Sequence, residues 1–180
     1  MASLMFVFYI LVVISGIVGG GRGWAKELLV TFAILVGLAL ISAFESWIPF
    51  TSAFIKVGSE VQFWFRTLII FAMAVFGYES PRMSKFAPAS GKRDQIQETL
   101  LGVVLGMING YLIAGSLWGF MHQANYPLQP YIISPENDPS LGLAASEMVR
   151  WLPTETFIGQ APGVYIIVIL SFVFVLVVFL

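Results

Sequence analysis

Residues 99–120 read TLLGVVLGMINGYLIAGSLWGF, an apolar stretch in which Gly102, Gly106 and Gly110 recur at every fourth position. Ala114 continues the row. Residues four apart lie on one face of a helix. In lipid, helices associate through close backbone contact between small residues, because the lipid tails are as apolar as leucine. This GxxxG pattern therefore predicts a transmembrane helix that packs tightly against another helix.

The composition of the whole chain agrees with a membrane location. Its 180 residues are 58% hydrophobic and 11% charged, and the mean hydropathy is +0.89. A soluble domain carries about a quarter charged residues, so most of this surface must face lipid or other helices. The formal net charge of -1 gives no support for a nucleic-acid partner. We expect the partners to be the lipid bilayer, other membrane proteins or further copies of the chain.

The residue types that support metal or covalent chemistry are scarce. The chain has no cysteine, and His122 is its single histidine. Zinc sites draw on several Cys, His or carboxylate ligands, and no such cluster is visible. The sequence also lacks a phosphate-binding glycine loop of the P-loop type and a recognisable pairing of nucleophile and base. We therefore expect no metal, no cofactor and no enzymatic activity.

Five stretches are long and apolar enough to be candidate spans, since a transmembrane helix needs about 20 apolar residues. They lie near residues 2–18, 24–43, 62–78, 99–120 and 163–180. The first could be a signal peptide, but it lacks a basic amino-terminal region and a clear cleavage site, so we interpret it as a retained span. The predicted fold is all-α, a polytopic transmembrane bundle forming one membrane domain over residues 1–180.

The charges between these spans predict the orientation of the chain. The first and third connections are basic, with Arg22, Lys26, Arg82, Lys85, Lys92 and Arg93. The second holds Glu45, Lys56 and Glu60, and the fourth holds Glu136, Asp138, Glu147 and Glu155 against Arg150. Basic connections face the cytoplasm. The pattern predicts an N-terminus outside and a C-terminus inside, in a bacterial inner membrane.

The fourth connection is long enough to contain a helix of its own, predicted at residues 139–152. Asp138 can cap this helix, Pro139 suits its first position, and Pro153 ends it. Its apolar residues are expected on one face, and they are Leu141, Ala144, Ala145, Met148, Trp151 and Leu152. An amphipathic helix of this kind lies on the membrane surface or on the other spans.

Two polar residues fall inside the predicted spans. Asn109 lies near the middle of the fourth span, where an unpaired amide costs several kcal/mol. We interpret it as a hydrogen-bonding contact between helices, with a polar gate or ligand contact as the alternative. Arg66 lies one turn inside the third span. We expect its side chain to reach the lipid head groups, with an ion pair to Glu60 or Glu45 as the alternative.

The first connection is expected to be a flexible, basic turn formed by the run from Gly19 to Gly23, followed by Lys26 and Glu27. Arg22 and Gly23 belong to this elbow, and a carboxylate such as Glu27 suits the first turn of the helix that follows. His122 lies at the far end of the fourth span. We interpret it as an interfacial residue without a ligand, and the alternative is an axial ligand to a haem or pigment.

These residues resemble the signature of the CvpA family, the colicin V production proteins. The segment from Gln97 to Gly102, followed by Gly106, Asn109 and Gly110, is similar to the family's polar pair, apolar pair and spaced glycines. The elbow is similar too, with Gly20, Arg22, Gly23, Lys26 and Glu27, and so is the closing helix that ends in Leu152 and Pro153. The resemblance covers residues 5–153.

The chain departs from the family in three places. It has Asn109 where the family has a basic residue before the last glycine. It has Glu98 and Thr99 where the family has an Asp-Arg-like pair, and it adds a span at residues 163–180. The resemblance implies a bacterial inner-membrane protein linked to colicin V production or export and to envelope maintenance.

Three functional hypotheses follow. The first is a CvpA-like, non-enzymatic protein that assists assembly, toxin secretion or envelope maintenance through helix-helix contacts, with the glycine row as the contact surface. The second is an accessory transmembrane subunit of a large respiratory or photosynthetic complex. The third is a small channel or transporter, which the scarcity of ionisable residues in the spans disfavours.

Overall fold

A computed structural model of the chain confirms the all-α fold class. It describes residues 3–47, 55–79, 92–129, 131–132, 134–135, 142–156 and 158–179, and this part of the chain contains helices and no strand. The elements are α1 (Leu4–Arg22), α2 (Trp24–Trp47), α4 (Glu60–Tyr78), α5 (Lys92–Gln123), α6 (Gly142–Val149), the short 3-10 helix η3 (Pro153–Glu155) and α7 (Gly163–Phe179).

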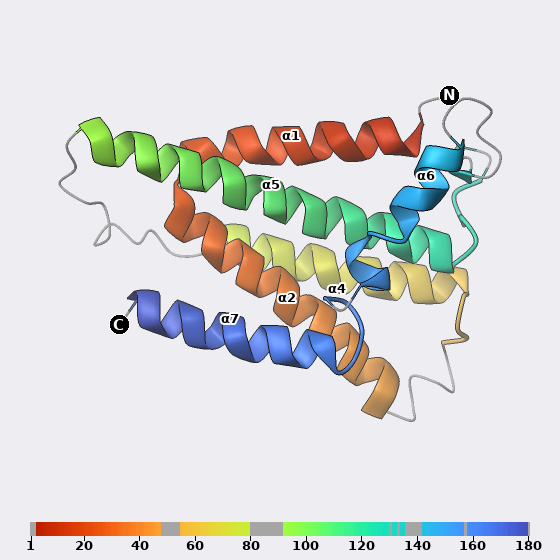
Figure 1. Ribbon diagram of the computed structural model, residues 1–180. Helices are drawn as coiled ribbons and strands as arrows, with labels where there is room; N and C mark the ends of the chain where they lie inside the picture. Colours follow the sequence, from red (N-terminus) through yellow and green to blue (C-terminus); the bar gives the residue numbers. More distant parts are fainter. Residues whose placement is uncertain are drawn as a thin grey trace.

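The long helices run side by side along one axis (Figure 1). α5 packs against α1 on one side and against α2 on the other, and α2 also contacts α4 and α7. α1 turns directly into α2 at one end of the bundle, which we call the elbow end. α6, η3 and the start of α7 lie at the opposite end, which we call the α6 end.

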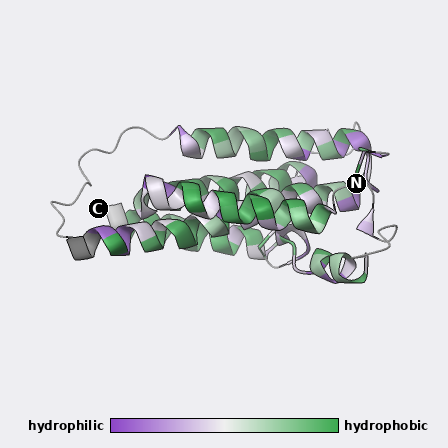
Figure 2. Cartoon of the chain, turned by 90° about the horizontal axis from the view of Figure 1, so that it is seen from above, coloured by the Kyte–Doolittle hydropathy of each residue, from purple (hydrophilic) through white to green (hydrophobic). Residues whose placement is uncertain are grey.

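Four helices are long and apolar enough to cross a membrane, namely α1, α2, α4 and the part of α5 from Gln95 to Gln123. Hydrophobic residues line the length of these helices, and hydrophilic residues gather toward their ends (Figure 2). The chain is therefore a membrane protein by the length and composition of its helices. The apolar core includes Val30, Ile34 and Leu38 of α2, which are at most 3% exposed.

The fifth predicted span forms α7, which has 17 residues. At about 1.5 Å per residue it is about 25 Å long, somewhat shorter than a bilayer core of about 30 Å. It runs antiparallel to α2. The hydroxyl groups of Tyr165 and Ser42 are 3.1 Å apart near the α6 end, and the rings of Phe172 and Phe32 are 6.1 Å apart further along.

The glycine row of α5 packs against α1 of the same chain. A Cβ atom added at Gly102 would lie 2.5 Å from the carbonyl oxygen of Gly19, and one added at Gly106 would lie 2.3 Å from that of Ser15. At Gly110 it would lie 2.8 Å from the Cβ of Ser15. Ala114 continues the row and is buried. The contact that the row predicts is therefore made inside the chain.

The prediction of a flexible glycine turn at residues 19–23 was wrong. α1 stays helical through Arg22, and Gly23 alone breaks it, with a φ of +89° that favours glycine. Gly19 has a packing role instead, because a Cβ atom there would lie 2.3 Å from the Gly102 carbonyl oxygen. Small residues on both helices thus allow close approach, which makes the α1–α5 contact a two-sided version of the predicted motif.

A second face of α5 uses small residues to hold η3. A Cβ atom at Gly115 would lie 2.6 Å from the Cδ of Pro153, and one at Gly119 would overlap the hydroxyl group of Thr154. Pro153 and Thr154 are themselves buried. This contact fixes the segment between α6 and α7 against the end of α5.

The helix predicted at residues 139–152 ends earlier in the structure, at Val149. α6 covers Gly142–Val149, and the expected cap at Asp138 and Pro139 lies outside the described residues. The chain leaves the helix in a turn in which the Trp151 amide donates to the Met148 carbonyl. Ala145 and Leu152 are buried against the bundle, whereas Trp151 is 71% exposed, so the predicted apolar face is only partly covered by the other helices.

Candidate functional site

A buried polar junction at the elbow end joins α2 to α5. Asn109 and Glu27 are both fully buried. The Asn109 amide nitrogen donates to the Glu27 carboxylate at 2.8 Å and to the Glu27 backbone carbonyl at 2.9 Å. The Thr31 hydroxyl donates to the Asn109 side-chain oxygen at 2.6 Å. Both hydrogens of the amide and its oxygen are thus used, which removes most of the cost of burying it in an apolar bundle.

Arg22 compensates the charge of the buried Glu27. The Arg22 Nε atom lies 2.9 Å from the Glu27 Oε1 atom, although the two do not align as a hydrogen bond. The Arg22 guanidinium carbon lies 4.4 Å from the centre of the Tyr78 ring, and Arg22 also donates to the Tyr78 carbonyl at 3.3 Å. The junction therefore ties α1, α2, α4 and α5 together.

Three of the residues on which the resemblance was based, Arg22, Glu27 and Asn109, meet at this junction. Arg22 and Glu27 come from the elbow, and Asn109 comes from the glycine row. A Cβ atom at Gly23 would lie 2.9 Å from the Glu98 carboxylate, so the start of the row also lies against the elbow. Lys26 is exposed and does not take part in the ion pair. Two motifs about 80 positions apart thus form one site.

A second polar cluster lies at the α6 end. Arg66 of α4 donates two parallel hydrogen bonds to the Glu45 carboxylate of α2, each 2.7 Å long. Gln62 donates to the same carboxylate at 2.9 Å. The Arg66 side chain is 13% exposed. Of the two interpretations of Arg66, the structure has the ion pair with Glu45, and the expectation that this side chain reaches the lipid head groups was wrong.

This cluster extends toward the end of the bundle through Gln123. Arg66 donates to the Gln123 side-chain oxygen, and the Gln123 amide nitrogen donates to Glu155 of η3 at 2.6 Å. A cavity of about 190 Å³ borders Glu45, Arg66 and Gln123. Glu45, Arg66, Gln123 and Glu155 therefore form a continuous polar chain, which we call the α6-end relay.

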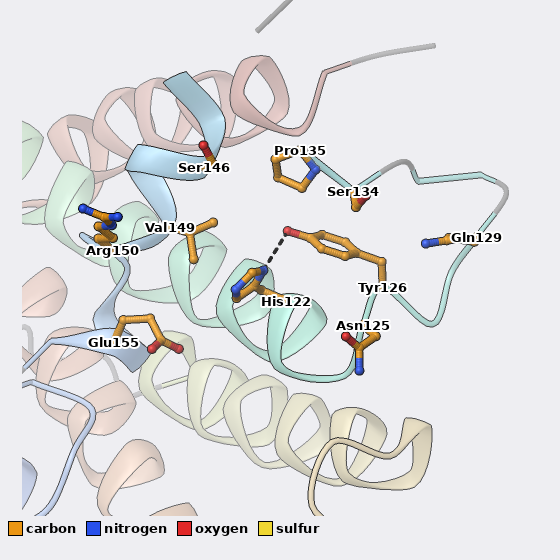
Figure 3. A pocket seen from close by; sticks show the side chains of 10 residues that line it. All are labelled: His122, Asn125, Tyr126, Gln129, Ser134, Pro135, Ser146, Val149, Arg150 and Glu155. Carbon is orange, nitrogen blue, oxygen red and sulfur yellow. Dashed lines mark hydrogen bonds between the residues drawn. The ribbon is translucent and has the colours of Figure 1, made fainter. Parts of the chain in front are cut away.

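A larger hollow of about 570 Å³ lies beyond the relay (Figure 3). We call it the α6-end basin. Its polar lining comes from the end of α5, the loop after it, α6 and η3, with His122, Asn125, Tyr126, Gln129, Ser134, Ser146, Arg150 and Glu155. Figure 3 shows Arg150 and Glu155 on the opposite side of the basin from Gln129. Glu155 belongs to both the relay and the basin, so the two are continuous.

His122 and Tyr126 occupy the middle of this view (Figure 3). The His122 Nδ1 atom lies 3.3 Å from the Tyr126 hydroxyl group, and the buried Trp118 indole donates to the same hydroxyl at 3.4 Å. Asn125 and Tyr126 have φ angles of +54° and +56°, a conformation that costs energy for residues other than glycine. The backbone strain therefore lies on the wall of the basin.

The described residues contain no group of three or more His, Asp or Glu side chains that could hold a metal ion. The two charged clusters lie near opposite ends of α2, about 27 Å apart by helix rise over 18 residues. Buried apolar side chains such as Val30, Ile34 and Leu38 fill the space along α2 between them. The described hollows with polar linings both border the α6 end.

Sequence reasoning found Asn109 and Glu27 but missed the residues of the α6-end relay beyond Arg66 and its candidate partner Glu45. Gln123 and Glu155 are polar residues next to a predicted loop, which is where polar residues are ordinary. One signal was available in Gln62 and Arg66, which lie four positions apart and so share a helix face.

Comparison of the chain with protein-family models, with curated proteins and with solved structures finds no match.

Proposed function

We propose that the chain is a CvpA-like integral protein of a bacterial inner membrane, and that it assists assembly, secretion or envelope maintenance without catalysing a reaction. The observation that carries this proposal is the hydrogen bonding of Asn109 to Glu27 beside Arg22. Two of the motifs that carry the resemblance, the elbow and the glycine row, supply the residues of this one buried junction, which gives these two motifs a common physical role.

The departure at position 109 supports the same proposal. The family's basic residue would stand where Asn109 faces the Glu27 carboxylate at 2.8 Å. A basic side chain there would neutralise Glu27 directly. In this chain the amide supplies hydrogen bonds and Arg22 supplies the positive charge, at 2.9 Å. With Asn109 in place of the basic residue, the Glu27 carboxylate still has a hydrogen-bond donor and a positive charge beside it, but two different side chains supply them.

Contact with a partner must use a surface other than the glycine row. α1 of the same chain covers Gly102, Gly106 and Gly110. The membrane-facing sides of α1 and α4 remain, and they carry exposed apolar residues such as Phe6, Ile17, Leu68 and Phe71. A leucine at Gly106 is accordingly expected to disturb the fold of the chain itself before it affects any assembly.

An accessory subunit of a respiratory or photosynthetic complex is the first alternative, and it predicts the same kind of exposed helix surface. A small channel or transporter is the second, and buried ionisable residues such as Glu27 are typical of such proteins. The apolar residues along α2, among them Val30 and Ile34, separate the two charged clusters in the described bundle. For this reason we place the channel last.

Purification of the full chain from its native membrane in a gentle detergent tests the proposal. Mass spectrometry identifies the proteins that accompany it, and an absorption spectrum reports bound pigment or haem. We expect a colourless preparation with defined secretion or envelope partners, or a small homo-oligomer. A coloured preparation that contains the subunits of an electron-transfer complex would overturn the proposal in favour of the first alternative.

A further inference from the structure

We propose that the α6-end basin binds a phosphoethanolamine group, supplied by phosphatidylethanolamine from the membrane leaflet on that side. This inference does not depend on the CvpA-like function, because it rests on the shape, the charges and the position of the basin. With a volume of about 570 Å³, the basin falls within the range of about 300–1,000 Å³ that is typical of small-molecule sites.

The basin holds two opposite charges that do not neutralise each other. Arg150 and Glu155 both line it. Among the described residues, Arg150 forms no ion pair with Glu155 or with any other carboxylate. Glu155 is engaged through one oxygen by the neutral amide of Gln123, at 2.6 Å. A zwitterion that carries an anionic and a cationic group can complement both side chains at once.

The charged side chains of the basin match the two ends of phosphoethanolamine. Guanidinium groups bind phosphate oxygens with strong, directional hydrogen bonds, so Arg150, which lines the basin, suits the phosphate. A primary ammonium group has three donors and no acceptor. The Glu155 carboxylate therefore suits the ammonium group, which a trimethylated choline head group cannot match by hydrogen bonding.

The basin lies at the end of a membrane-spanning helix. It begins at His122, in the last turn of the membrane-spanning helix α5. Leu143 and Trp151, on either side of the α6 segment that lines the basin, are 87% and 71% exposed. Exposed tryptophan is typical of the membrane interface. A lipid head group is thus the phosphate and ammonium source at this level.

The polar wall of the basin formed by Asn125 and Tyr126 is held in a fixed conformation. Tyr126 is 5% exposed, and Trp118, which donates to its hydroxyl, is 1% exposed. Asn125 and Tyr126 are both held at positive φ. Strained backbone at a concave, polar surface is a recurring property of ligand sites. The wall that carries Asn125 is therefore fixed before a ligand arrives.

The experiment uses the full chain, purified in detergent and stripped of lipid. Native mass spectrometry then measures the binding of phosphatidylethanolamine, phosphatidylglycerol and phosphatidylcholine. We expect phosphatidylethanolamine to bind about tenfold more tightly than the other two, since charge-assisted hydrogen bonds at one end of the head group are lost in each. Equal binding of the three lipids would overturn the proposal, because it would indicate an unspecific lipid shell.

Two variants test the assigned side chains. Glu155→Gln should lower the preference for phosphatidylethanolamine by about tenfold, and glutamine at this position keeps an oxygen for Gln123. Arg150→Gln should weaken the binding of phosphatidylethanolamine itself by about tenfold, since the phosphate that Arg150 binds is common to all three lipids. Glu147→Gln is the matched control, because Glu147 is exposed on α6 and does not line the basin. Thermal midpoints equal to that of the wild type exclude misfolding. A preference that survives Glu155→Gln, or phosphatidylethanolamine binding that is unchanged in Arg150→Gln, would overturn the proposal.

Competition with soluble O-phosphoethanolamine distinguishes the sources of the group. Displacement of the lipid by the soluble compound supports recognition of the head group alone, from either source. Retention of phosphatidylethanolamine against a large excess of the soluble compound supports the membrane lipid, whose tails then add to the binding. Binding of the soluble compound together with indifference to phosphatidylethanolamine would overturn the assignment to the lipid.

Discussion

The Glu27–Asn109 pair shows how a single amide makes a buried carboxylate tolerable in an apolar bundle. Glu27 is fully buried, and it meets Asn109 at 2.8 Å and Arg22 at 2.9 Å. Burial of the pair is weak evidence for net stabilisation, because desolvation offsets the attraction. Breaking such a pair is strongly destabilising, because it leaves a buried charge uncompensated.

Asn109→Asp is expected to destabilise the chain strongly, because it places two carboxylates of nearly the original shape face to face at 2.8 Å. The free energy of unfolding should fall by about 3 kcal/mol or more. Thermal unfolding in detergent measures the change. Asn125→Asp is the control, since Asn125 is exposed, and it should leave stability nearly unchanged.

The swapped pair Glu27→Gln with Asn109→Asp should recover at least half of that loss. The carboxylate then stands on α5 and the amide on α2, and the net charge beside Arg22 is unchanged. A double-mutant cycle isolates this coupling. Additive effects of the two substitutions would contradict the direct contact between residues 27 and 109.

Arg66 provides the matching test at the α6 end. Arg66→Lys keeps the charge but cannot make both 2.7 Å bonds to Glu45 and still reach Gln123. We expect the free energy of unfolding to fall by about 1–3 kcal/mol. Lys26→Arg is the control, because Lys26 is exposed. Equal midpoints for the two variants would mean that the bidentate geometry contributes nothing.

At the scale of the elements, close approach between α1 and α5 depends on glycine on both helices. Gly19 and Gly102 each leave room for the other's backbone, because a Cβ atom at either position would lie 2.3–2.5 Å from the carbonyl oxygen of the other. Without a side chain at these positions the helices gain van der Waals contact, which is the main source of association in lipid. The same length of helix with alanine in the row would hold the two axes further apart.

Gly106→Ala should therefore lower the free energy of unfolding by about 1–3 kcal/mol, the usual cost of overpacking. A Cβ atom there would lie 2.3 Å from the Ser15 carbonyl oxygen, so α1 would have to move. Gly21→Ala is a matched control in α1, because a Cβ atom at Gly21 meets nothing within 4 Å. Alanine at that helical position should be neutral or stabilising by up to about 1 kcal/mol. Similar losses in both variants would indicate a general effect of glycine on the helices.

The apolar stretches of the sequence predicted where the helices lie, but they did not predict where the helices end. α2 extends to Trp47 and α5 begins at Lys92, beyond the predicted spans, because a helix continues into the polar interface where hydropathy no longer marks it. Gly19 and Gly20 were misjudged for a tertiary reason. Glycine favours a turn in isolation, and only the partner helix shows that here it serves packing.

Only part of the two polar clusters could be predicted from the sequence, for a similar reason. Asn109 stands out because an amide in an apolar stretch requires a partner, and Glu27 is its partner. The α6-end relay is built from residues whose polarity is ordinary near a loop, such as Gln123 and Glu155. Their importance comes from which helices the fold brings together, and this depends on contacts between α2, α4, α5 and η3.

At the scale of the whole molecule, the polar groups divide between two ends of an apolar bundle. The elbow end holds the Arg22–Glu27–Asn109 junction, and the α6 end holds the relay and the basin. Basic residues in the first connection predict that the elbow end faces the cytoplasm. The membrane-spanning arrangement requires that these two ends lie on opposite faces of one membrane.

Site-directed cysteine labelling tests that requirement most directly, because the chain has no cysteine of its own. Gly21→Cys at the elbow end and Gln129→Cys at the α6 end are both exposed positions. With a membrane-impermeant maleimide, we predict that Gln129→Cys reacts in intact spheroplasts and that Gly21→Cys reacts only after permeabilisation. Labelling of both variants from the same side would contradict the membrane-spanning arrangement, and reversed labelling would contradict the proposed orientation.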